Sequence, residues 1–117
     1  MRKLKLLTKY KHFKEKEYMV LGVSTPISEE FSFAIVADQI MPVIHTEKES
    51  FINVLITTDY KDTMYRHFKS DWDGNLVIYM VLYDDFKIYV RPYDMFMSLV
   101  DKEKYPNIKQ KYRFEEI

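Results

Sequence analysis

Residues 75–99 read NLVIYMVLYDDFKIYVRPYDMFMSL, and this stretch decides the fold. Residues 76–83 are eight consecutive apolar or aromatic side chains rich in Val, Ile and Tyr, which is typical of a strand buried on both faces. After two aspartates, residues 86–90 alternate in the way that is typical of a half-exposed strand. We therefore predict an antiparallel hairpin with a tight turn at Asp84 and Asp85.

The second predicted strand ends at Arg91, and a proline follows it directly. Proline suits the first position of a helix, and Phe96 and Leu99 come next at a spacing of three residues. We predict a short helix after Pro92 that folds back on the hairpin.

Further strands are predicted on the N-terminal side of this hairpin. Residues 18–24 and 51–57 have high β propensity, and Gly22 marks a place where a strand bends or is closely approached. We expect Pro26 to end the first of these strands, and we expect residues 43–47 to be a short extended piece. The sequence thus predicts a mainly β protein.

Residues 28–40 can be interpreted in two ways. A serine followed by two acids is a helix start signal, and Pro42 is a stop signal, so a short helix is the favoured interpretation. Phe31, Phe33 and Ile35 also alternate as they would in a strand. The fold that we predict is a small, SH3-like partial β-barrel of five or six strands, with the helix after Pro92 and the option of a second helix in 28–40.

Composition excludes several classes of protein. The chain has 117 residues, of which 47% are hydrophobic, and this predicts a single folded domain spanning residues 1–117. Two glycines cannot supply a P-loop or a dinucleotide fingerprint, and the absence of cysteine excludes disulfides, thiolate metal sites and cysteine nucleophiles. No apolar run approaches the roughly 20 residues of a membrane span, and the N-terminal apolar segment is too short for a secretory signal. We expect a cytoplasmic protein with no cofactor and no membrane contact.

Charge is unevenly distributed although the net charge is zero. Residues 1–16 carry seven bases and one acid, whereas residues 24–60 carry six acids and one base. Such segregation can build a basic face for an anionic partner, or it can let the ends of the chain pair with the middle.

Several segments together resemble a family of small bacterial and phage domains, the domain-of-unknown-function family 1653. The matching segments are YKHFK at 10–14, the strand at 18–22, HTE at 45–47, the run at 76–83, the segments at 90–92 and 95–96, and the tail at 101–114. The family-like core is therefore 10–24, 43–47 and 75–114, with inserts at 25–42 and 48–74. Glu15 replaces the usual glycine after HFK. The resemblance implies a small, strand-rich, barrel-like domain and no established activity.

Six polar or aromatic side chains on these segments are predicted to bind a ligand: His12, Lys14, His45, Tyr79, Tyr89 and Arg91. A guanidinium fork and an ammonium suit phosphate or carboxylate, and an anion also suits the amides at the start of the helix after Pro92. Tyrosines beside cations on an exposed sheet face can stack bases. The alternative for each residue is structural: a histidine bonded to a backbone carbonyl, a solvated lysine, an arginine paired with a carboxylate, and tyrosines in the core.

Three functions remain open at this point. The leading hypothesis is a non-catalytic domain that binds an anionic ligand, such as a nucleotide, a nucleic acid or another phosphate-bearing molecule. The second is a protein-interaction module that acts through the inserts at 25–42 and 48–74. The third is a small hydrolase that uses His45 and Glu47, which would share one face of a strand. We assign no catalytic residue, and because the three histidines lack short ligand spacing we expect no metal site.

Overall fold

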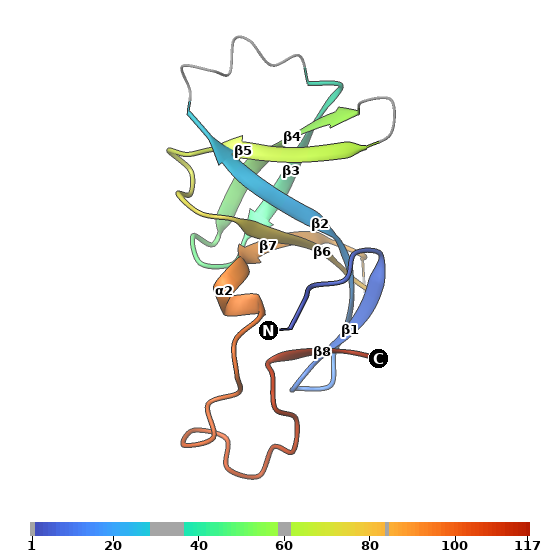
Figure 1. The fold of residues 1–117 in the computed structure, drawn as a ribbon, viewed down its shortest axis with the longest axis vertical. Coiled ribbons are helices and arrows are strands. Elements are labelled where there is room, and N and C mark those ends of the chain that lie inside the picture. The colour runs from blue at the N-terminus through green and yellow to red at the C-terminus, as the bar shows by residue number, and fades with distance from the viewer. Residues whose placement is uncertain (1, 29–36, 59–61, 84) are drawn as a thin grey trace.

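The computed structural model describes residues 2–28, 37–58, 62–83 and 85–117. These residues contain eight strands and one short helix (Figure 1). The strands are β1 (Thr8–His12), β2 (Glu17–Ile27), β3 (Gln39–His45), β4 (Ser50–Thr58), β5 (Thr63–Phe68), β6 (Leu76–Val81), β7 (Ile88–Pro92) and β8 (Phe114–Glu116). The helix, α2 (Tyr93–Phe96), follows Pro92 as predicted.

Six of the strands close into a barrel. They follow the order β5-β4-β3-β7-β6-β2, and β2 also pairs with β5 to complete the ring. This closure is possible because β2 is eleven residues long: its first part is antiparallel to β6, and its last four residues are parallel to β5. The prediction of a mainly β barrel with a short helix is confirmed, and the barrel is closed rather than partial.

Two prolines that were expected to end elements lie inside strands instead. Pro26 lies in β2 and pairs with His67 of β5. The pairing of β2 with β6 has already ended at Ser24, so β2 has one neighbouring strand at Pro26. On its other side no N–H is needed for pairing, and a proline is tolerated there. Pro42 lies in β3. Most of the helix predicted in 28–40 falls on residues 29–36, outside the described residues, while Gln39 already belongs to β3. The strand β5 was not predicted.

Gly22 occupies the close approach that the sequence predicted. A β-bulge separates Val20 from Gly22 in the pairing with β6. A Cβ atom at Gly22 would lie 2.5 Å from Cε2 of Tyr65, so only glycine lets the ring of Tyr65 cover the strand without a shift.

The β6 strand is buried on both faces, as predicted. Leu76 and Ile78 point into the barrel, where they pack with Val43, Ile52, Val54 and Val90. Val77 and Tyr79 point outward into a second cluster with Tyr10, Val20, Phe96 and Phe114. In that second cluster the rings of Phe96 and Phe114 stack with their centroids 4.1 Å apart.

The predicted hairpin is confirmed, and its turn closes between Tyr83 and Phe86, where the N–H of Phe86 donates to the carbonyl of Tyr83 at 3.5 Å. Strands β6 and β7 pair from Leu76–Pro92 to Met80–Ile88, and residues 82–87 connect them. The N–H of Val81 donates to the carbonyl of Lys87 at 2.9 Å, which extends the pairing beyond Met80–Ile88 toward the turn. Asp84 lies outside the described residues.

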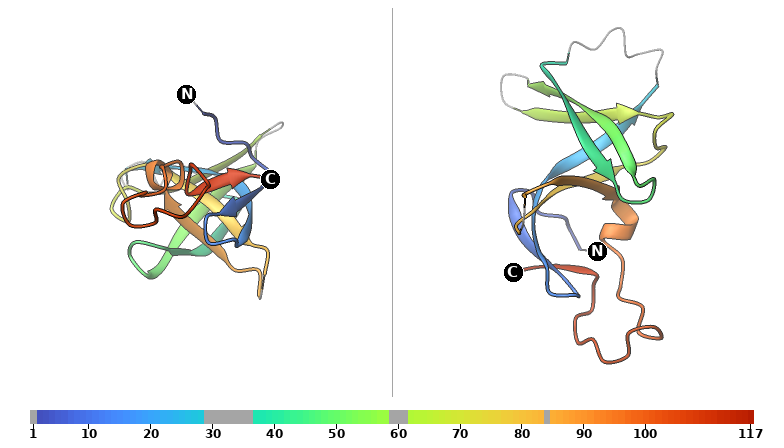
Figure 2. Two further views of the ribbon diagram at one scale, coloured as in Figure 1. Left: turned by 90° about the horizontal axis from the view of Figure 1, so that it is seen from below. Right: turned by 180° about the vertical axis from the view of Figure 1, so that it is seen from behind.

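The remaining elements lie beneath the barrel (Figures 1 and 2). Strand β1 pairs with β2, and β8 pairs with β1. Residues 97–113 form a loop that projects away from the barrel. Two backbone hydrogen bonds of 2.9 Å close the base of this loop: the N–H of Val100 donates to the carbonyl of Lys111, and the N–H of Arg113 donates to the carbonyl of Ser98. No helix among the described residues is long and apolar enough to cross a membrane.

Candidate functional site

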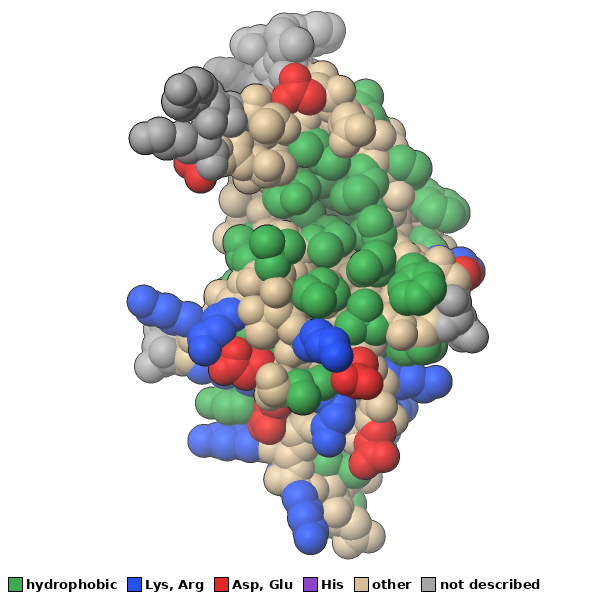
Figure 3. Space-filling view, turned by 90° about the vertical axis from the view of Figure 1, so that its right-hand side faces the viewer, with side chains coloured by type: hydrophobic (Ala, Val, Ile, Leu, Met, Phe, Trp, Pro, Cys, Tyr) green, Lys and Arg blue, Asp and Glu red, His purple; other side chains and the backbone are tan. Residues whose placement is uncertain are grey.

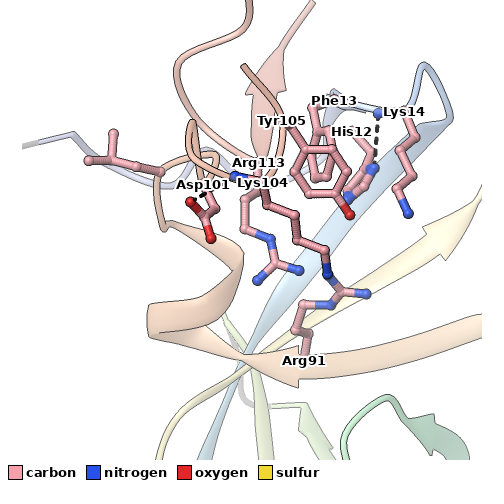
Figure 4. Close-up of a pocket in the computed structure, with 9 residues that line it drawn as sticks. His12, Phe13, Lys14, Arg91, Asp101, Lys104, Tyr105 and Arg113 are labelled. Carbon is pink, nitrogen blue, oxygen red and sulfur yellow. Dashed lines mark hydrogen bonds between the residues drawn. The ribbon is translucent and has the colours of Figure 1, made fainter. Parts of the chain in front are cut away.

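A pocket of about 400 Å³ lies between β1, β7 and the loop 97–113 (Figure 4). Its lining comes from four places that are far apart in the sequence. The lining residues are His12, Phe13, Lys14, Arg91, Leu99, Asp101, Lys104, Tyr105 and Arg113.

The loop is attached to the turn after β1 by aromatic and backbone contacts. The rings of Phe13 and Tyr105 lie 4.8 Å apart, and the N–H of Phe13 donates to the carbonyl of Arg113 at 3.0 Å. The amide of Gln110 donates to the carbonyl of Lys11 at 2.9 Å. These contacts hold Arg113 and the loop against β1 and so define one wall of the pocket.

The pocket concentrates positive charge. Lys14, Arg91, Lys104 and Arg113 face one acid, Asp101. Among the described residues, no carboxylate oxygen lies within 4.0 Å of the charged nitrogens of these four cations. Asp101 instead accepts the backbone N–H groups of Glu103 and Lys104, at 3.0 and 3.4 Å. Positive charge therefore exceeds negative charge in the pocket, where Asp101 is the one acid of the lining and Glu47 attracts Arg113 only from beyond ion-pair distance.

Two aromatic rings lie beside the Arg91 guanidinium. Its Cζ atom lies 5.1 Å from the centroid of Phe114 and 5.9 Å from the centroid of Tyr79. A guanidinium donates hydrogen bonds from its edges, in the plane of the group. Contact with the two rings thus helps to hold Arg91 in place at the pocket.

The positive charge of the pocket contributes to the low pKa of His12. Burial is the largest cause, and repulsion by Arg91, Arg113 and Lys14 adds to it; together they lower this pKa from 6.5 to about 4. Its Nδ1 atom accepts the N–H of Lys14 at 3.1 Å, so the neutral ring carries its proton on Nε2. Burial, followed by repulsion from Arg91, also lowers the pKa of Arg113. A bound anion would oppose the repulsive part of both shifts.

The structure brings three of the six predicted ligand-binding residues into this pocket: His12, Lys14 and Arg91. Tyr79 and Tyr89 line a smaller cavity that also contacts Arg91, although Tyr79 is buried and offers no exposed stacking face.

His45 lies elsewhere, fully buried at the end of β3. Its ring lies 4.6 Å from the ring of Trp72. Its Nδ1 atom accepts the backbone N–H groups of Glu47 and Lys48, at 3.1 and 3.2 Å. His45 is therefore a structural residue of the turn between β3 and β4.

The sequence predicted three of the nine lining residues and missed the other six, Leu99 and Asp101 among them. Phe13, Lys104, Tyr105 and Arg113 were not predicted as ligand-binding residues, and the last three lie in the tail segment 101–114. The signals available were the basic character of that tail and its aromatic residues. Among the described residues, no group of three or more His, Asp or Glu side chains is placed to hold a metal ion.

Comparison with known proteins identifies a family for the C-terminal half. The model of a family described as "Protein of unknown function (DUF1653)" matches residues 60–116. This segment supplies Arg91, Lys104, Tyr105 and Arg113 to the pocket, whereas His12 and Lys14 lie outside it. No curated protein and no solved structure matches the chain.

Proposed function

Because residues 60–116 belong to DUF1653, a family of unknown function, we propose a function from the site itself: the domain binds a phosphate-bearing anion in the cationic pocket, without catalysis. One observation carries the proposal. Four cationic side chains converge on one hollow whose lining holds a single acid, and none of the four forms an ion pair within 4.0 Å among the described residues. Arginine and lysine in such an arrangement are the groups that bind phosphate.

The dimensions of the pocket favour a small ligand. A volume of about 400 Å³ lies at the lower end of the range, roughly 300–1,000 Å³, that is usual for small-molecule sites. The loop 97–113 forms one wall, so the pocket is a hollow rather than an open groove along a strand (Figure 4). A nucleotide or a single phosphorylated end fits this geometry better than a long duplex does.

The chemistry of the lining supports binding without catalysis. The nine lining residues include no Ser, Thr or Cys, and the Nδ1 atom of His12 already accepts the N–H of Lys14. The hydrolase hypothesis required His45 and Glu47 to act together, but the His45 ring is fully buried and its Nδ1 atom is used by backbone N–H groups. We do not propose a hydrolase.

Calorimetric titration with inorganic phosphate, AMP and ADP tests this function. Arg113→Gln removes one cation from the pocket, and Arg66→Gln is its matched control because Arg66 lies on β5, outside the pocket. A hydrogen bond to a charged group contributes about 1.5–3 kcal/mol, so Arg113→Gln should weaken phosphate binding by roughly 10- to 100-fold. The control should bind as the wild type does. Equal affinity of Arg113→Gln and the wild type, or no binding by the wild type, would contradict the proposal.

An exposed apolar surface favours the second hypothesis, a protein partner. Ile40, Phe51 and Met64 are 62%, 70% and 41% exposed, and they lie on β3, β4 and β5 within residues 25–42 and 48–74. Figure 3 shows hydrophobic side chains gathered over the upper half of one face, with charged side chains over the lower half. Apolar patches of this kind mark interaction sites.

Deletion of either segment is a poor test of this second hypothesis because both segments supply strands to the barrel. Two point substitutions, Ile40→Ser and Phe51→Ser, change the surface and leave the strands in place. If the surface binds a partner, proteins captured from a lysate by the wild type should be lost with the double variant, while phosphate binding is unchanged. Capture of the same proteins by both would contradict a role for this surface.

A further inference from the structure

A second, smaller cavity adjoins the cationic pocket at Arg91. Its volume is about 110 Å³. It is lined by Tyr18, Thr46, Tyr79, Val81, Tyr83, Tyr89 and Arg91. Arg91 lines both cavities, so the side chain of one arginine lies between two separate hollows.

Two donors in this second cavity are buried without a partner. The Oγ1 atom of Thr46 and the Nε atom of Arg91 make no hydrogen bond to any described residue. A buried polar group without a partner costs about 1–3 kcal/mol, and native structures rarely retain one without a reason. Two such atoms on residues that line one small cavity make the cavity a candidate site for a hydrogen-bond acceptor.

The tyrosines of the cavity add a third donor. The hydroxyls of Tyr18 and Tyr83 lie 3.1 Å apart and share one hydrogen bond, so one of their two protons remains available. Burial, together with the Tyr83 hydroxyl, raises the pKa of Tyr18, which therefore stays protonated at neutral pH. The Nζ atom of Lys16 lies 4.4 Å from the ring centroid of Tyr83. The seven lining residues include no carboxylate.

The size of the cavity limits what can enter it. At roughly 30 Å³ per water molecule in the liquid, about 110 Å³ holds only a few water-sized groups. A phosphoryl group fits this space, and a purine ring system does not. The donors and the neighbouring cations select an oxyanion among groups of that size.

We propose that Arg91 bridges two oxyanion groups of one ligand, so that the ligand class is a diphosphate-bearing compound. This inference rests on the proposed function, and it deepens it. One phosphoryl group binds in the cationic pocket with Arg113 and Lys104, and the second enters the small cavity against Thr46 and Nε of Arg91. A guanidinium donates hydrogen bonds from its edges, in the plane of the group, so both ligand groups bind there.

Thr46→Val tests the bridge without changing charge or shape, and Thr63→Val, at an exposed position that begins β5, is its matched control. The probes are inorganic phosphate and inorganic pyrophosphate, titrated by calorimetry into the full chain. We expect the wild type to bind pyrophosphate at least tenfold more tightly than phosphate. Thr46→Val should reduce this preference to less than threefold and leave phosphate affinity unchanged, while Thr63→Val keeps the full preference.

The outcomes separate this inference from the proposed function. If Thr46→Val keeps the full preference for pyrophosphate, the bridge is wrong and anion binding stands. If Thr46→Val weakens phosphate and pyrophosphate by the same factor, Thr46 supports the pocket and does not bind a second group, so the bridge is again wrong. If the wild type binds neither probe, the proposed function itself fails.

Discussion

Strand β7 has two faces that serve different purposes. Val90 points into the barrel and is fully buried with other aliphatic side chains. Its neighbour Arg91 points to the opposite side, beside two aromatic rings and other cations. Two consecutive residues thus belong to an apolar interior and to a cationic pocket.

The two regions should contribute to stability with opposite signs. Burial of apolar side chains in the barrel stabilises the fold by about 25 cal/mol per Å². Cations held close together without counter-charges repel one another, which opposes folding until an anion binds. We expect variants of the barrel interior to lose stability, and variants of the pocket to lose binding while keeping or gaining stability.

The largest effect is expected in the barrel. Ile78→Ala removes three buried carbons from the interior and should lower the free energy of unfolding by about 3 kcal/mol, within the range measured for such truncations. Urea unfolding measures this change. Ile40→Ala, at an exposed position of β3, should lower the free energy of unfolding by less than about 0.5 kcal/mol. Similar losses in both variants would show that the side chains of β6 do not fill a packed interior.

A smaller loss is expected at the bulge. Gly22→Ala places a methyl group against the ring of Tyr65 and should cost about 1–3 kcal/mol, as overpacking does. Tyr65→Ser removes the ring, so the double variant should lose less than the sum of the two single variants. Additive losses, measured by urea unfolding of all three variants, would argue against the close approach.

The hairpin could be predicted from sequence because its signal is local. A run of eight apolar residues followed by alternation specifies two strands and their faces, and β6 and β7 show both patterns. The strand β5 was missed because its residues are polar, aromatic and basic, and tertiary pairing with β2 and β4 makes them a strand. Pro26 and Pro42 misled the prediction because a proline is tolerated where a strand has a free side.

The pocket could be predicted only in part because pairing between distant segments assembles it. Arg91 and His12 stood out beside recognisable strands, whereas Lys104 and Arg113 are isolated charges in a polar tail without periodic spacing. Their place in the pocket depends on long-range contacts, such as that of Gln110 with Lys11. Thr46 carried no signal at all, since an unpartnered hydroxyl becomes visible only in three dimensions.

Protonation of His12 is expected to have a moderate effect on how the free energy of unfolding depends on pH. The unfolded ring takes up a proton near pH 6.5 and the folded ring only near pH 4, so the unfolded state binds more protons between these values. Stability should therefore fall as the pH drops from about 6.5 to about 4, and His12→Gln should remove part of this slope. Because the ring is partly exposed, solvent screening reduces its share to about 1 kcal/mol. An unchanged slope, measured by urea unfolding across this pH range, would contradict the low pKa.

The smallest change in stability, and the one that best separates the two regions, is expected for Arg113→Gln. It removes a cation that Arg91 repels, so the free energy of unfolding should rise by up to about 0.5 kcal/mol while phosphate binding falls. The gain should shrink in 1 M salt, where the screening length is about 3 Å, because salt already weakens the repulsion in the wild type. Arg66→Gln, outside the pocket, should show neither the gain nor the loss of binding. A clear loss of stability in Arg113→Gln would mean that the arginine supports the fold, and the division of β7 into a structural face and a binding face would then be wrong.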